Sequence, residues 1–193
     1  MIQRLAIGIA LTGLFIGTTV AARQAKPAAA APKPAAAAAG PVLVVETPKG
    51  TFEIQTYPED APKSHEHVLQ LVRQSFYRGQ RIFYASPNAV QFGDPNTKDM
   101  TKKDRWGMGN SGNSVGVAET SKRVFDKGIV ILYYANGYPP KTADCQLLIL
   151  KQTNPTIQGK YAVIGKVSTG MDIADKLEVA DRIVNLYVKG EKK

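Results

Sequence analysis

The sequence predicts a mainly β fold, a closed β barrel capped by two helices, for residues 41–193. Short apolar runs recur along this part of the chain, and glycine or proline separates most of them, as expected of strands joined by turns. Helical spacing of apolar residues is confined to two stretches. Many short strands with few helices favour a barrel, because closure leaves no strand edge unpaired.

The first 22 residues predict a Sec-type signal peptide. Arg4 precedes an apolar run over residues 5–20, and the small residues Val20-Ala21-Ala22 are typical of a cleavage site after Ala22. The alternative is an uncleaved membrane anchor, for which the run is short, since a span needs about 20 apolar residues. We therefore expect a periplasmic or secreted protein with no stable membrane insertion after cleavage.

Residues 23–40 form an Ala/Pro-rich tract that predicts a disordered linker. The tract has no aromatic or branched apolar side chain from which to build a core. Three prolines within it, Pro27, Pro32 and Pro34, interrupt any long helix. The folded domain is therefore predicted to begin at Pro41.

Charge and reactive side chains exclude several functions. The formal charge is +9, and four cations with no acids lie in residues 1–40, which leaves +5 on the folded part. That basic excess is spread and forms no nucleic-acid motif. Cys145 is the only cysteine, so no intrachain disulfide can form, and His65 and His67 stand two apart on a predicted helix, too poorly aligned for a metal site. We expect a monomer without metal, cofactor or nucleic acid.

The domain opens with a predicted hairpin followed by a helix. Residues 42–45 are apolar and residues 51–56 alternate with period two, so Phe52 and Ile54 should point inward. Ser64 is the predicted N-cap of the helix, which ends by Gly79.

The stretch RIFYASPNAVQFGDP, residues 81–95, predicts a strand, a kink, a second strand and a turn. Gln91 stands alone between apolar neighbours. An amide both donates and accepts hydrogen bonds, so Gln91 could hold a peptide backbone if it faces a cleft. The alternative is a strand whose glutamine faces solvent.

A polar loop over residues 96–114 follows, in which Trp106 either pins the loop to the body or lines a groove. The remaining elements are a short strand from Val117, a near-continuous apolar strand that is either buried on both faces or part of a barrel wall, three further strands and a short helix. These are predicted at residues 117–119, 129–135, 145–150, 161–167, 182–188 and 172–178. The first and last strands are candidates to pair with each other.

Collinear motifs in this order resemble the cyclophilins. The segments are VETPKGTFEIQTYPEDAPK at residues 45–63, QFGDP at 91–95, AN at 135–136, CQLLI at 145–149, GKYAVIGKV at 159–167 and GMD at 170–172. The resemblance covers residues 41 to about 178. It implies an eight-stranded antiparallel barrel with two capping helices. It also implies cis/trans isomerisation of X-Pro bonds in proline-containing polypeptides, without cofactor or metal.

The resemblance also implies a site. Gln91 matches a glutamine that holds the peptide backbone, and Tyr161 stands where the family often has histidine. Catalytic roles are implied for Gln91, Asn136 and Tyr161, and substrate binding for Phe83, Ala135, Leu148 and Ile157. Leu148 takes the place of a phenylalanine that floors the proline pocket.

One departure from the family pattern concerns its catalytic arginine. Phe83 is followed by Tyr84 and Ala85, with about two residues fewer before Gln91, and Ala85 stands at the implied arginine position. Losing such a charged donor costs a factor of about 10²–10³ in rate by analogy with a lost oxyanion donor. Arg81 is the nearest replacement, although strand alternation favours an outward side chain.

Three functions follow as alternatives. The first is a peptidyl-prolyl isomerase that acts on exported proteins with reduced activity. The second is a non-catalytic proline-peptide binding or chaperone-like module of the same fold. The third is a tethered envelope interaction protein that works through its basic surface.

Overall fold

The structure is a computed structural model that describes residues 39–191. The predicted signal peptide and all but the last two residues of the predicted linker lie outside the described residues. Within residues 39–191, no helix has the length and apolar character that crossing a bilayer requires.

Eight strands form one antiparallel sheet in the order β3-β4-β6-β5-β7-β2-β1-β8. The strands are β1 (Val42–Thr47), β2 (Gly50–Thr56), β3 (Tyr84–Ala85), β4 (Ala89–Phe92), β5 (Ile129–Leu132), β6 (Leu147–Leu150), β7 (Ala162–Thr169) and β8 (Asn185–Val188). The predicted hairpin is β1–β2, and Phe52 and Ile54 are fully buried as expected. The first and last strands do pair, with Leu43 opposite Val188.

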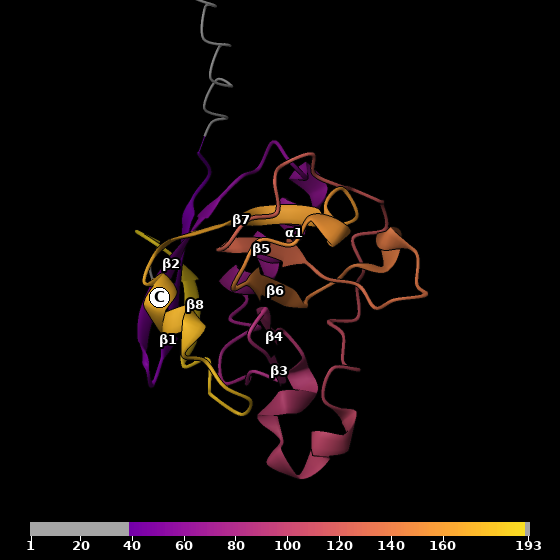
Figure 1. Cartoon of the computed structure of the whole chain (residues 1–193). Coiled ribbons are helices and arrows are strands. Elements are labelled where there is room, and N and C mark those ends of the chain that lie inside the picture. The colour runs from indigo at the N-terminus through magenta and orange to yellow at the C-terminus, as the bar shows by residue number, and fades with distance from the viewer. Residues whose placement is uncertain (1–38, 192–193) are drawn as a thin grey trace, which may run out of the picture. The chain divides into compact units, whose positions relative to one another are not determined.

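The prediction of a closed barrel is wrong, because the sheet is an open, curled half-barrel. Its two end strands are β3 and β8, which do not pair with each other. The segments that precede them are joined by an isolated bridge between Arg81 and Arg182 and by neighbouring backbone hydrogen bonds. Register shifts at Glu53/Ile54 and Val130/Ile131 bend the sheet on either side of β7. Figure 1 shows the result, with β1, β2 and β8 steeply inclined to β5, β6 and β7. The end strand β3 is only two residues long.

The central strands bury both faces, which explains their unbroken apolar runs. One face packs with α1 (Pro62–Arg73) in a large apolar core. Val130, Leu132 and Ile149 are completely buried in this core. The opposite face carries a second apolar cluster: Ala89, Phe125, Ile129, Ile131, Leu148, Leu150, Tyr161 and Val163. The prediction that residues 129–135 form a strand buried on both faces is thus confirmed for β5. The second cluster is the surface on which the functional site stands.

Helix α1 begins two residues before the predicted cap. Its N-cap is Ala61, which offers no side chain, and Pro62 begins the helix. A carboxylate from a distant loop replaces the missing cap: Glu119 accepts from the backbone N–H groups of Lys63 at 3.1 Å and Ser64 at 2.7 Å. A carboxylate at this end also suits the helix dipole. A cap supplied across 55 residues leaves no local sequence signal.

Three other expectations change. The polar loop after β4 contains two 3₁₀ helices, η1 (Pro95–Lys98) and η2 (Met100–Arg105), which lie beyond β3 in Figure 1. The strand predicted at residues 117–119 does not form, because these residues run as an irregular segment whose Glu119 caps α1. The second helix, α2 (Met171–Asp175), is shorter than expected.

Burial of His65 predicts a loss of stability in mild acid. Burial lowers the pKa of this histidine; the nearby Glu59 raises the pKa by a smaller amount, and Arg73 lowers it further. The Nε2 atom of His65 has no hydrogen-bond partner among the described residues. The unfolded chain therefore takes up this proton first as the pH falls, so the stabilisation is complete above about pH 6.5 and declines below it. Melting temperatures at pH 7.5 and 5.5 should show a larger fall for the wild type than for His65→Leu. Equal falls would contradict this assignment.

Candidate functional site

A groove of about 1300 Å³ lies over the second apolar cluster. All seven residues predicted for the site line it, although they are spread over the chain from residue 83 to residue 161: Phe83, Gln91, Ala135, Asn136, Leu148, Ile157 and Tyr161. Gln91, Asn136 and Leu148 thus share one hollow. The roles assigned to these residues remain predictions.

The floor of the groove is a row of side chains across three strands. Gln91 of β4 lies opposite Leu148 of β6, and Leu148 lies opposite Ile131 of β5. Directly opposed residues of antiparallel strands point to the same face. Leu148 and Gln91 are buried, at 8% and 6% relative exposure. The floor therefore sets a carboxamide beside an apolar dent.

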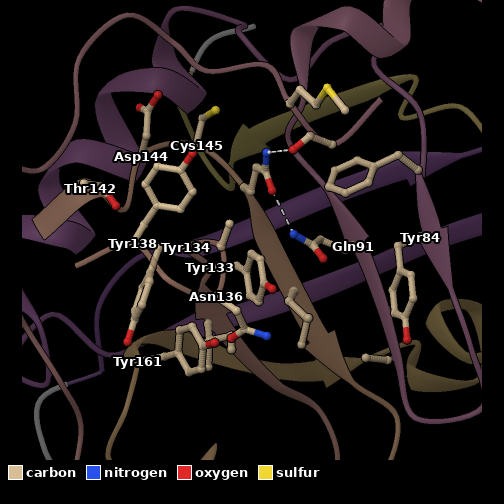
Figure 2. Close-up of a pocket in the computed structure, with 18 of the residues that line it drawn as sticks. Tyr84, Gln91, Tyr133, Tyr134, Asn136, Tyr138, Thr142, Asp144, Cys145 and Tyr161 are labelled. Atoms are coloured by element: carbon tan, nitrogen blue, oxygen red, sulfur yellow. Dashed lines mark hydrogen bonds between the residues drawn. The ribbon is translucent and has the colours of Figure 1, made fainter. Parts of the chain in front are cut away.

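A hydrogen-bonded chain fixes the orientation of Gln91. Its Nε2 donates to Oε1 of Gln146 at 2.9 Å, and Nε2 of Gln146 donates to the carbonyl oxygens of Gly107 at 2.9 Å and Gly109 at 3.2 Å (Figure 2). The N–H of Gly107 in turn donates to the buried carboxylate of Asp94. The Oε1 atom of Gln91 is left as the acceptor for a bound backbone N–H.

Tyrosines form one wall of the groove. Tyr133 stacks on Tyr161 with ring centroids 5.5 Å apart and planes at 13°, and Tyr134 packs against Tyr161 at 4.7 Å. The Tyr134 hydroxyl donates to the carbonyl of Lys160 at 3.0 Å. Desolvation, and then the neighbouring Tyr133 and Tyr134, raise the pKa of Tyr161, so its phenol stays protonated at neutral pH.

The remaining predicted residues border this floor. Ala135 and Asn136 are exposed on the loop that follows β5, and a turn closed by the Tyr138 N–H on the Ala135 carbonyl, at 3.1 Å, holds that loop. Ile157 packs against the second cluster from the loop after β6. Trp106 lines the groove, and its Nε1 donates to the Asp99 carbonyl at 3.3 Å within the same loop, a bond that does not tie the loop to the body.

No lysine or arginine lines the groove in the described part of the chain. Arg81 lies elsewhere, with a guanidinium nitrogen donating to the Ala180 carbonyl at 3.0 Å, so it does not replace the family arginine. The placement of the arginine position at Ala85 needs correction, because Ala85 packs against the large core. Tyr84 lines the groove instead, directly opposite Gln91. The short connection between β3 and β4 sets this register.

Asp144 supplies a carboxylate at the far end of the groove. Burial opposes its charge, but His67 Nε2 at 3.0 Å and the Ser111 hydroxyl at 2.5 Å and N–H at 2.6 Å outweigh burial, so the pKa of Asp144 is lowered. Burial also raises the pKa of the neighbouring Cys145 thiol, so it is not a nucleophile at neutral pH. Residues 39–191 contain no cluster of acidic, histidine and cysteine side chains suited to a metal ion.

Sequence reasoning missed Gln146, Tyr133 and Tyr84. Gln146 lies within a quoted motif, two residues before Leu148, and the period of two could have placed it on the same face. Tyr133 lies two residues after Ile131 and could have been found in the same way. Tyr84 depends on the register across the β3–β4 turn, which only the structure supplies.

Comparisons with known proteins identify the family. A family model described as "Cyclophilin type peptidyl-prolyl cis-trans isomerase/CLD" matches residues 42–188. A probable peptidyl-prolyl cis-trans isomerase of Brucella abortus is 31% identical over 155 residues, which span 78% of each chain. The peptidyl-prolyl cis-trans isomerase CYP18-2 of Arabidopsis thaliana is 28% identical over 143 residues, 71% of this chain and 80% of the relative.

Solved structures share the fold. A cyclophilin-type isomerase of Cryptosporidium parvum superimposes with a TM-score of 0.66 at 19% identity, covering 79% of this chain and 99% of that one. The cyclophilin AquaCyp293 of Hirschia baltica gives a TM-score of 0.61 at 16% identity, covering 79% and 75%. The sequence matches, together with a half-barrel that carries its groove over β4, β5 and β6, show that this chain belongs to the cyclophilin-type peptidyl-prolyl cis-trans isomerase family.

Proposed function

We propose that the groove binds proline-containing segments of exported polypeptides and accelerates rotation about the X-Pro bond, more slowly than in relatives that carry the family arginine. The observation that carries this proposal is the adjacency of Gln91 and Leu148 on the groove floor. Leu148 offers an apolar seat to the proline ring. Gln91, oriented by Gln146, offers a carbonyl acceptor to the peptide backbone.

Catalysis of this rotation requires only a groove that binds the twisted amide. The barrier to amide rotation is about 18–20 kcal/mol, and unaided X-Pro bonds isomerise in tens to hundreds of seconds. Catalysis requires a site that binds the twisted amide more tightly than either planar form. A related structure from Cryptosporidium parvum was determined in the presence of the dipeptide Ala-Pro, which supports a proline-containing ligand here.

The predicted reduction in rate follows from the groove's lack of a guanidinium among the described residues. The same observation favours a second candidate function, a module that binds proline-containing peptides without useful turnover. Export is proposed from the signal-like residues 1–22 and the linker-like residues 23–40. Detection of the mature chain in a periplasmic or culture-medium fraction, starting at residue 23, is the expected outcome for export.

Exchange spectroscopy on a short peptide with one Ala-Pro bond tests the function. Wild-type protein is expected to accelerate cis/trans exchange, and Gln91→Ala to lower kcat/KM by about 10²-fold through loss of a preorganised polar contact. The variant should fold, since Gln91 lines the groove and belongs to neither apolar cluster. Peptide binding without accelerated exchange in the wild type would favour the binding module.

A further inference from the structure

The groove contains neutral hydrogen-bond donors where the family resemblance calls for a cation. Rotation about an X-Pro bond breaks the amide conjugation, so the nitrogen regains a lone pair and becomes a better acceptor. A donor that reaches this nitrogen binds the twisted amide more strongly than the planar one. Because no lysine or arginine lines the groove within residues 39–191, this donor must be neutral. The neutral candidates around the floor are Tyr84, Gln91, Asn136, Tyr133 and Tyr161.

Three of the five are poorly placed for this task. The Gln91 amide nitrogen is already engaged with Gln146 at 2.9 Å, so its role is that of an acceptor. Asn136 stands exposed on the loop after β5, and Tyr84 is 47% exposed on the end strand of the sheet, so water competes for the donors of both side chains. The donor is therefore sought between Tyr133 and Tyr161.

The strand register places Tyr133 beside the proline seat. Ile131 lies opposite Leu148, and Tyr133, two residues further along, lies on the same face. Its N–H donates to the Gln146 carbonyl at 2.8 Å, so the antiparallel pairing continues to this position. Tyr133 therefore neighbours both Leu148, the seat of the ring, and Gln146, the residue that orients Gln91.

The ring of Tyr133 is held while its hydroxyl is left available. Tyr161 supports the ring from behind in a parallel stack, at a centroid distance of 5.5 Å. Within the described residues the Tyr133 hydroxyl has no hydrogen-bond partner, whereas the hydroxyl of Tyr134 is used by Lys160. Figure 2 shows Tyr133 projecting into the space between Gln91 and Asn136. Tyr161 is buried within the second apolar cluster, whereas Tyr133 is half-buried, so Tyr133 is the more accessible of the two phenols.

We propose that the Tyr133 hydroxyl is the hydrogen-bond donor that stabilises the twisted X-Pro amide in this groove, with Tyr161 as the residue that positions its ring. The inference rests on the proposed isomerase function and names the group that performs it. A phenol is uncharged and gives a weaker hydrogen bond than a guanidinium. A phenol donor would therefore accelerate the rotation less than the family arginine does, in agreement with the reduced rate proposed above.

The test removes one oxygen atom. Tyr133→Phe keeps the ring stack and the groove shape. Its melting temperature should therefore equal that of the wild type within error, and its Kd for an Ala-Pro peptide should stay within twofold of the wild-type value. Its kcat and kcat/KM should both fall by about tenfold or more, as expected for an interaction made only in the transition state. Tyr57→Phe is the matched control, because Tyr57 lies outside the groove lining and packs under Arg123.

Three results overturn the proposal, and they are distinguishable. If the wild type accelerates exchange and Tyr133→Phe does so within twofold, the donor is another group. If Tyr161→Phe loses turnover while Tyr133→Phe keeps it, the two roles are reversed. If the wild type binds the peptide but never accelerates exchange, the proposed function fails and this inference fails with it. A drop confined to Tyr133→Phe, with Kd unchanged, supports the assignment.

Discussion

Replacing Leu148 with aspartate is expected to lower kcat/KM for an Ala-Pro peptide by about 100-fold or more, because the change removes the apolar seat of the proline ring and puts a charge in its place. Leu148 is 8% exposed at the centre of the groove floor, between Gln91 and Ile131 on the neighbouring strands. No cation lines the groove among the described residues, so the new carboxylate would have no partner. Peptide binding should weaken together with turnover, since the proposed seat would hold the proline ring in both planar forms.

A graded series separates loss of the seat from loss of the fold. Leu148→Ala truncates the side chain without adding charge, and it should lower kcat/KM by about tenfold, in line with the transfer free energy of a few methylene groups. Circular dichroism and thermal melts establish that each variant is folded at the assay temperature. An aspartate variant that is folded and retains turnover within tenfold of the wild type would move the active site away from this groove.

The floor of the groove could be predicted because it depends on local signals. Gln91 and Leu148 lie in short strands, within the contiguous motifs QFGDP and CQLLI, and these motifs occur in the same order as in the family. Strand alternation then fixes which face each one occupies. The structure places both in one groove, together with Ala135, Asn136, Ile157, Phe83 and Tyr161.

The wall of the groove could not be predicted in the same way, because it depends on contacts between strands. Ala85 was the expected arginine position from counting residues, but the turn between β3 and β4 sets Tyr84 opposite Gln91 instead. The support of Gln91 by Gln146 and of Tyr133 by Tyr161 likewise arises only when separate strands pair. A one-residue change of register exchanges the two faces of a strand, so counting along the sequence cannot settle such positions.

The barrel closure was mispredicted for a related reason. Eight strands with few helices are compatible with a closed barrel or with an open sheet that curls, and sequence patterns do not distinguish them. Here β3 is two residues long, and the sheet ends on it. That short edge also leaves one side of the groove open at Tyr84, which is 47% exposed.

Substituting alanine for Gly93 is expected to destabilise the domain by roughly 3–5 kcal/mol, a large share of the ~5–15 kcal/mol typical of a domain. Gly93 has φ of +115°, which side chains rarely adopt, and it follows directly on β4. A Cβ there would lie 2.2 Å from the Cys145 carbonyl oxygen and 2.7 Å from the Gln146 Cα. Both obstacles are backbone atoms next to β6, so the strands must separate.

Gly112→Ala is the matched control for this effect. Gly112 has a similar φ of +96°, but nothing lies within 4 Å of the position of an added Cβ. This variant should lose only about 1 kcal/mol, the cost of the backbone conformation alone. Denaturant unfolding of the two variants therefore isolates the steric part, and equal losses would show that close approach at Gly93 is unimportant. The clash at Gly93 also displaces Gln146, which orients Gln91. The folded molecules of Gly93→Ala should therefore have a lower kcat/KM than the wild type. Gly112→Ala should keep the wild-type kcat/KM.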